Sequence, residues 1–175
     1  MIHILTGRVD SGKTTLLGRV INNLSHLEKR FDGFLTRKVY EGERFIGYDL
    51  FDLKRREVFP YIRQTLAPDE AQVGRFYFLP EGLERAIRII LRHQIIDYLI
   101  VDEVGPLELA GRGLWPALSQ QLRRSGFRGL LVMRTGLIDS FLDLLQGLEI
   151  RQFDIASPSI EADLQAAIES LYPSS

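Results

Sequence analysis

The stretch from Ile2 to Leu17 constrains the fold of this chain more than any other. An apolar, β-prone segment runs directly into Gly7–Thr14, which fits the pattern G-x-x-x-x-G-K-[ST], and a helical pattern follows. Strand, glycine-rich turn and helix are the context that a phosphate-binding loop requires. Gly7 and Gly12 permit backbone angles that a Cβ would obstruct, so successive amide N–H groups can point at phosphate oxygens. The pattern therefore predicts a nucleotide-binding site.

The side chains of this loop have distinct predicted roles in binding the nucleotide. Lys13 is long enough to reach the β- and γ-phosphates, and the Thr14 hydroxyl is a ligand for Mg²⁺. The helix that begins near Lys13 adds the positive end of its dipole. A turn that merely caps a helix is the alternative, and the flanking strand and helix disfavour it. The predicted nucleotide-binding residues are Gly7, Arg8, Val9, Asp10, Ser11, Gly12, Lys13, Thr14 and Thr15.

Most of the remaining chain alternates between helical and β-prone segments. Apolar residues at helical spacing predict helices over residues 13–30, 80–93, 114–122 and 137–148, and a last helix after Ser157 with Pro158 in its first turn. Apolar runs predict strands over residues 97–103, 129–134 and 149–155, and residues 105–113 are expected to form a loop. Such alternation predicts an α/β protein with a mostly parallel sheet covered on both faces. We expect one three-layer P-loop NTPase domain over residues 1–175.

Residues 33–78 follow a different pattern. Strands are predicted over 33–40 and 44–51, joined by a hairpin turn at Glu41-Gly42-Glu43, with a short edge strand at 57–61, a loop at 64–73 and a strand at 75–79. This segment is interpreted as an antiparallel meander inserted into the α/β fold. Its aromatic and basic side chains are candidates for contact with a substrate or partner. A solvated hairpin face explains them equally well.

A second chemically informative stretch is Tyr98–Glu103, in which four apolar residues precede two acids. The acids emerge at the carboxyl end of a buried strand, where ligands bind in open α/β sheets. This is the Walker B pattern, in which Asp102 holds Mg²⁺ directly or through a water. Glu103 is predicted to polarise the attacking water as a general base, so Glu103 and Lys13 are the catalytic candidates. Two solvated acids at a strand end are the alternative.

A Glu directly after the Walker B Asp also indicates a topology. It resembles the additional-strand ATPase class, related to RecA-like proteins, in which one more strand separates the phosphate-loop strand from the Walker B strand. The segment 129–134 is the expected extra strand, and Arg134 or Thr135 at its end is a candidate γ-phosphate sensor. A polar cap on the strand end is an equal alternative. Arg112 is a further candidate for stabilising transition-state charge, with a surface role as its alternative.

Composition limits the other functional classes. The chain has 175 residues, a net charge of −1 and no cysteine. A net charge close to zero gives no clear signal of nucleic-acid binding. Because the chain has no cysteine, disulfides and thiolate metal sites are excluded. We expect no signal peptide and no membrane-spanning segment. The chain is therefore predicted to be cytoplasmic, and no protein partner is indicated.

Several stretches, in the same order, resemble a known family. They are Thr6–Thr15; Gly33–Thr36 with Glu41–Tyr48; Gly74–Phe78 with Glu81–Glu84; and Val101–Leu109. The last is the most distinctive, because the family typically carries Asp-Glu-Ile/Val-Gly-x-x-Glu-Leu there. The chain resembles the small P-loop nucleoside-triphosphatases, often described as thermophilic or cancer-related. One departure is Val132–Thr135, where the family often has a Thr-Val-His-like segment.

The resemblance implies a RecA-like sheet and Mg²⁺-dependent hydrolysis of nucleoside triphosphates such as ATP and GTP, with broad base tolerance. Two other functions stay open from the residues. A nucleotide or small-molecule kinase would need an acceptor pocket, which the meander is able to build, although a water-activating Glu103 argues against it. A slow nucleotide-gated module that regulates a partner is the third hypothesis.

Overall fold

The computed structural model describes residues 1–64, 72–73, 76–95 and 97–172. Nine strands within these residues form one sheet in the order β5-β6-β4-β3-β2-β7-β8-β1-β9. The strands are β1 (Ile2–Gly7), β2 (Phe31–Glu41), β3 (Arg44–Asp52), β4 (Val58–Arg63), β5 (Gln72–Val73), β6 (Phe76–Phe78), β7 (Tyr98–Val104), β8 (Gly129–Arg134) and β9 (Ile150–Asp154). The helices are α1 (Lys13–Asn23), α2 (Pro80–Leu91), α3 (Pro106–Leu109), α4 (Trp115–Leu122), α5 (Ile138–Leu144) and α6 (Ile160–Glu169), with 3₁₀ turns η1 (Ser25–Arg30) and η2 (Thr135–Leu137).

The sheet has a parallel half and an antiparallel half. Strands β2, β7, β8, β1 and β9 pair in parallel, whereas β3, β4, β6 and β5 pair antiparallel on the far side of β2. Strand β8 lies between β1 and β7, which confirms the expected additional strand. The carboxyl ends of β1, β7 and β8 therefore lie side by side at one edge of the sheet.

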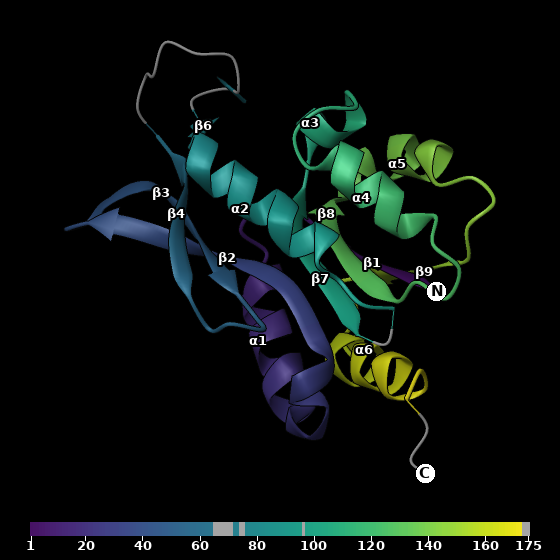
Figure 1. Ribbon diagram of the computed structural model, residues 1–175. Helices are drawn as coiled ribbons and strands as arrows, with labels where there is room; N and C mark the ends of the chain where they lie inside the picture. The colour runs from purple at the N-terminus through teal and green to yellow at the C-terminus, as the bar shows by residue number, and fades with distance from the viewer. Residues whose placement is uncertain (65–71, 74–75, 96, 173–175) are drawn as a thin grey trace.

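Helices cover both faces of the sheet, so the predicted three-layer α/β architecture is confirmed (Figure 1). Helices α1 and α6 pack on one face, and α2, α4 and α5 pack on the other. Alternate residues of β7 point to the two layers: Leu99 and Val101 join one apolar core, while Tyr98 and Ile100 join the other. All four are essentially inaccessible to solvent, which is why this strand reads as an unbroken apolar run.

The antiparallel half is the predicted meander, with two corrections. Gly42 adopts a positive φ of 59° in the tight turn between β2 and β3, as expected for a hairpin. Strand β4 is not an edge strand, because β6 pairs with its last residues, Ile62 and Arg63, beyond Pro60. Within the predicted loop, Gln72–Val73 forms β5 at the sheet edge, and residues 65–71 lie outside the described residues.

Three predicted helix boundaries are wrong. Helix α1 ends at Asn23, because the backbone leaves helical geometry at Leu24 and continues as a 3₁₀ turn in which the Leu27 N–H bonds the Leu24 carbonyl. Helix α2 ends at Leu91 and α5 at Leu144, both earlier than their apolar patterns indicate.

Two loop predictions also change. Residues 105–113 contain the short helix α3, which begins at Pro106. Pro158 precedes Ser159, the N-cap of α6, and so lies outside the first turn of that helix. No helix in the described part of the chain is long and apolar enough to cross a membrane.

A buried ion cluster ties the antiparallel half to the core. Arg92, directly after α2, donates hydrogen bonds to Asp32 on β2 and to Asp52 on β3, with the shortest contact to each at 2.7 and 2.5 Å. Both carboxylates are at most 1% exposed. Although burial opposes it, hydrogen bonding by Arg92 lowers the pKa of Asp52. The cluster lies at the end of the sheet opposite the phosphate loop, because Asp32 is near the start of β2.

Replacing Arg92 with methionine is expected to lower the free energy of unfolding by about 3–5 kcal/mol, because buried Asp52 loses its cationic partner and buried Asp32 keeps only Lys54, 3.9 Å away. Urea unfolding at neutral pH measures the loss. The matched control is Arg88→Met on α2, where an exposed pair with Glu84 is removed and the cost should stay below about 1 kcal/mol. Equal losses in the two variants would contradict a stabilising role for the cluster.

Candidate active site

The phosphate loop connects β1 to α1 at the carboxyl edge of the sheet. Gly12 caps α1 with a left-handed φ of 87°, and Asp10 also adopts a positive φ of 58°. A Cβ on Gly7 would collide with the Ile155 side chain and stand 2.7 Å from the Ser11 hydroxyl. Backbone of this kind turns successive amides to one side of a concave loop, which is how such loops bind anions. The two glycines of the motif are therefore required by conformation at Gly12 and by space at Gly7.

Lys13 lies folded over the loop. Its Nζ donates hydrogen bonds to the carbonyl oxygens of Gly7 (3.2 Å) and Arg8 (2.7 Å). Burial lowers the pKa of Lys13, and the neighbouring carboxylates Glu103 and Asp102 oppose that shift. A cation is thus held directly beside the concave loop, where a phosphate chain would need it.

Asp102 is the most enclosed acid of the site, at 1% exposure. Its Oδ2 accepts hydrogen bonds from the Thr14 hydroxyl (2.8 Å), the Thr36 amide (3.0 Å) and the Thr36 hydroxyl (2.9 Å). Its Oδ1 is buried and has no hydrogen-bond partner among the residues that the structure describes. Burial raises the pKa of Asp102 despite these donors. One oxygen is therefore fixed in place, while the other is left without a partner by the described residues and is available to a bound ligand.

These residues fit a magnesium ion. An orphaned carboxylate oxygen on Asp102 lies next to a threonine hydroxyl, and hard oxygen ligands are those that Mg²⁺ prefers. No cluster of three or more His, Asp or Glu side chains suited to a metal occurs in the described ranges. Mg²⁺ at nucleotide sites needs no such cluster, because one or two protein ligands, substrate phosphates and waters complete its shell.

Glu103 has a setting opposite to that of its neighbour. It adopts a left-handed φ of 69°, and the pairing of β7 with β8 shifts register between Val101 and Val104 at this point. The irregularity turns the Glu103 side chain into an open cavity. Desolvation by the surrounding protein, and then the negative charge of Asp102, raise the pKa of the Glu103 carboxyl. Strain in a left-handed residue is often found at functional positions.

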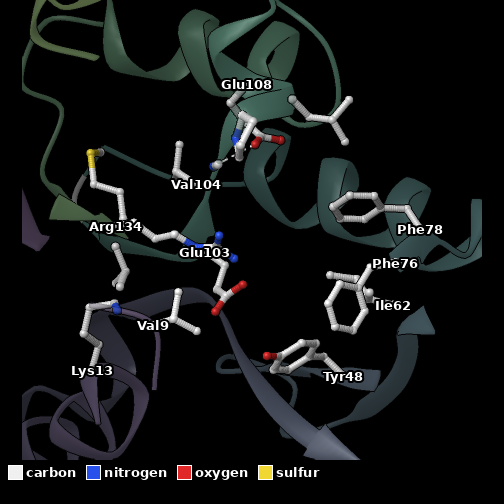
Figure 2. Close-up of a pocket in the computed structure, with 15 residues that line it drawn as sticks. Val9, Lys13, Tyr48, Ile62, Phe76, Phe78, Glu103, Val104, Glu108 and Arg134 are labelled. Atoms are coloured by element: carbon white, nitrogen blue, oxygen red, sulfur yellow. Dashed lines mark hydrogen bonds between the residues drawn. The ribbon is translucent and has the colours of Figure 1, made fainter. Parts of the chain in front are cut away.

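Two adjoining cavities meet at Glu103, whereas the buried Asp102 lines neither of them. One, of about 520 Å³, follows the phosphate loop from Asp10 to Thr15 and is closed on its other side by β2. The second, of about 350 Å³, lies beyond Glu103 between the ends of β7 and β8 and the antiparallel half of the sheet. Lys13, Tyr48 and Glu103 line both. Figure 2 shows Glu103 in the second cavity, with Lys13 and Arg134 on one side and Tyr48 and Phe76 on the other.

The predicted site residues divide between these spaces. Asp10 to Thr15 line the larger cavity and Val9 the smaller, while Gly7 and Arg8 contribute the carbonyls that hold Lys13. Asp10 is also paired with Lys38 at 2.7 Å. The predicted loop, Asp102 and Glu103 are therefore brought together.

The candidate sensors are separated by the fold. Arg134 lines the smaller cavity with Lys13 and Glu103, and its side chain extends toward Glu103 (Figure 2). Thr135 begins η2 and lines neither of the two cavities. Arg112, in the loop after α3, also lines neither cavity. Of these polar residues, Arg134 is the one that the structure places at the site.

Sequence reasoning gave no role to three residues that shape the site. Thr36 reaches Asp102 from β2, and Tyr48 lines both cavities from β3. Glu108 is 2% exposed and accepts hydrogen bonds from the amides of Gly105 (2.9 Å) and Leu114 (3.0 Å), which fixes the loop after β7. All three lie in stretches that resemble the family, Gly33–Thr36, Glu41–Tyr48 and Val101–Leu109. Their roles could not be predicted, because each depends on contacts between segments that are far apart in the chain or on the fold of a loop.

The phosphate loop, the two acids at the end of β7 and the strand between β1 and β7 have the arrangement of a P-loop protein of the additional-strand class. Solved structures agree with this fold. A human cancer-related nucleoside triphosphatase matches with a TM-score of 0.74 at 21% identity, covering 99% of this chain and 98% of that one. THEP1 from Aquifex aeolicus matches with a TM-score of 0.69 at 19% identity, covering 99% and 100%.

Sequence comparison gives the family. The family model described as NTPase matches residues 2–158, so the chain belongs to that family. A curated relative, nucleoside-triphosphatase THEP1 of Thermotoga maritima, is 37% identical over 111 residues, which is 62% of this chain and 60% of the relative. The chain spans about 60% of the lengths of the first curated relatives it matches.

The left-handed backbone at Glu103 can be tested by stability. Glu103→Asn and Glu103→Gln both remove the charge, but asparagine adopts the left-handed region more readily than glutamine. The free energy of unfolding of the asparagine variant should therefore be about 0.5–1 kcal/mol higher than that of the glutamine variant. The same two substitutions at exposed Glu149, which has no positive φ, are the control and should differ less. No difference at Glu103 would refute the strain.

Proposed function

We propose that this chain hydrolyses nucleoside triphosphates to the diphosphate and phosphate in a Mg²⁺-dependent reaction. The observation that carries the proposal is the contrast between two adjacent carboxylates. Asp102 is buried and hydrogen-bonded, whereas Glu103 opens into the cavity beside the phosphate loop. Adjacent acids in different environments can hold different protonation states and take different roles. The names of the curated relatives, nucleoside-triphosphatase THEP1, support the same activity.

The loop residues bind and orient the triphosphate. The amides from Val9 to Thr15 and the start of α1 provide donors and a positive dipole end for the phosphate chain. Lys13 releases the loop carbonyls and contacts the β- and γ-phosphates. These contacts involve only the phosphate chain and not the base, which agrees with use of ATP, GTP and other triphosphates.

Thr14 and Asp102 would hold Mg²⁺, through the Thr14 hydroxyl and the free Asp102 Oδ1. The ion, when bound, neutralises charge on the phosphates. Thr36 keeps Oδ2 engaged, so that the carboxylate cannot rotate freely. The residues thus fix the position of the metal ligands before the ion arrives.

Glu103 acts as the general base. Its carboxylate takes a proton from a water that attacks the γ-phosphorus, and the bond from that phosphorus to the β–γ bridging oxygen breaks. Lys13 and Arg134, on the same side of the cavity, stabilise the negative charge that spreads over the phosphoryl oxygens.

We place the enzyme in the cytoplasm.

Glu103→Gln should lower the rate of phosphate release from ATP, GTP and CTP by about 10²–10⁴-fold, because the amide cannot accept the proton. Binding of a non-hydrolysable ATP analogue, measured by calorimetry, should be retained. Glu149→Gln on the exposed surface before β9 is the matched control and should hydrolyse at the wild-type rate. Unchanged turnover in Glu103→Gln would sink the assigned base role.

Thr36→Val removes the hydroxyl that donates to Asp102 but keeps the backbone donor and the shape of the side chain. The Mg²⁺ concentration for half-maximal turnover should rise roughly 10-fold or more, because the carboxylate is less firmly oriented. Thr36→Ser, which restores the hydroxyl, should return it close to the wild-type value. A valine variant with wild-type Mg²⁺ dependence would show that this contact does not tune the metal site.

A further inference from the structure

The smaller cavity is not required by hydrolysis. A single water molecule needs only about 10–15 Å³ of such space, yet the space beyond Glu103 measures about 350 Å³, which lies in the range of cavities that hold small organic molecules. It adjoins the phosphate-loop cavity through three shared residues, Lys13, Tyr48 and Glu103. A molecule in it would therefore lie on the far side of Glu103 from the phosphate loop.

The lining of this cavity selects against a charged occupant. Lys13, Arg134 and Glu103 lie together at the phosphate-loop end (Figure 2). The Glu108 carboxylate, in the opposite wall, already accepts amide hydrogen bonds with each of its oxygens. Apart from Tyr48 and Gly105, the remaining wall is formed by apolar side chains: Val9, Ile62, Phe76, Phe78, Val104, Pro106, Leu107, Val132 and Met133. Among the described residues that line this cavity, the cations are Lys13 and Arg134 at the phosphate-loop end, so the apolar wall offers no counter-charge to a second phosphate chain.

Aromatic rings give the cavity a preference for a planar, apolar body. Tyr48 and Phe76 face one another with ring centroids 6.2 Å apart, and Phe78 packs edge-on against buried Tyr61 at 5.2 Å. These contacts fix the rings before any ligand binds, so little side-chain entropy is lost on binding. The antiparallel half of the sheet supplies this wall, through β3, β4 and β6.

Apart from the Glu108 carboxylate, whose two oxygens already accept amide hydrogen bonds, the polar side chains lie at the end of the cavity that holds the Glu103 carboxylate. The Tyr48 hydroxyl is directed to that end in Figure 2, and burial, followed by the charge of Glu103, raises the pKa of Tyr48 to about 12. This hydroxyl therefore stays protonated at neutral pH and is available as a hydrogen-bond donor. A ligand with an apolar ring and a single hydroxyl group matches this division of the surface.

From this arrangement we infer that the smaller cavity binds a second substrate, a neutral ring-bearing alcohol, which accepts the γ-phosphoryl group. The inference rests on the proposed function of Glu103 and the phosphate loop. The alcohol oxygen attacks the γ-phosphorus, the bond from that phosphorus to the β–γ bridging oxygen breaks, and the alcohol proton passes to Glu103. The products are a phosphate monoester and the nucleoside diphosphate. Hydrolysis is then the reaction that occurs when water occupies the acceptor position.

The test uses the full chain, Mg²⁺ and ATP radiolabelled at the γ-phosphate, with naphthylmethanol as the acceptor. Ethylnaphthalene, which keeps the ring but has no hydroxyl, is the matched ligand for binding measured by its fluorescence. We expect label in naphthylmethyl phosphate at least about tenfold above the enzyme-free background, and saturable binding of ethylnaphthalene. Hydrolysis of ATP with no labelled ester would overturn the inference while leaving the proposed function intact.

A cavity-filling variant locates the acceptor. Leu107→Trp places an indole in the smaller cavity from α3 and should reduce both ester formation and ethylnaphthalene binding by at least about tenfold. Leu91→Trp, at the exposed end of α2, makes the same substitution at 45% exposure and should behave as wild type. Ester formation that is equal in the two variants would overturn the inference. So would a raised Kd for ATP in Leu107→Trp, since the cavity would then hold the nucleotide itself.

Failure of the proposed function has a different signature. If wild-type protein releases no phosphate from ATP, the proposed hydrolytic function is wrong. Ethylnaphthalene binding then still tests whether the smaller cavity is a ligand site. Saturable binding that Leu107→Trp abolishes supports the cavity as a ligand site. Its absence from wild-type protein overturns the inference.

Discussion

The hydrogen bonds to Asp102 are the interaction on which the rest of the site depends. A buried carboxylate at the end of β7 accepts hydrogen bonds from the first turn of α1 and from the middle of β2. These hydrogen bonds connect three elements that are far apart in the chain. A carboxylate left without such donors in this place would be costly to bury. Because Asp102 is satisfied on one oxygen only, the same contacts that stabilise the fold leave an oxygen for a cation.

The sheet order gives these contacts their location. With β8 between β1 and β7, the phosphate loop and the two acids are separated by the width of one strand, and the end of β8 lies between them. Arg134 therefore reaches the space that a γ-phosphate would share with Glu103. The register shift between Val101 and Val104 orients the two acids differently: the Asp102 side chain is buried and the Glu103 side chain points into the cavity.

The antiparallel half extends this plan. It continues the parallel sheet through β2 and is held to the core by the Arg92 ion cluster at the end away from the phosphate loop. At the other end its aromatic side chains close the smaller cavity. Charge thus anchors one end of the insertion and apolar surface shapes the other. This arrangement explains how an insertion of ordinary hairpins becomes part of the wall of the candidate site.

Besides the additional strand, whose place was expected from a resemblance to other ATPases, the sequence by itself determined the local features of this protein: the loop Gly7–Thr14, the acids after a buried strand and the alternating α/β pattern. Each depends on neighbours in the chain, on glycine conformation or on apolar periodicity. Only the tertiary structure decided that Thr36 holds Asp102, that Arg134 rather than Thr135 or Arg112 lines the cavity, and that Tyr48 and Phe76 form its wall. These depend on strand register and on pairing between distant segments, which no local pattern encodes.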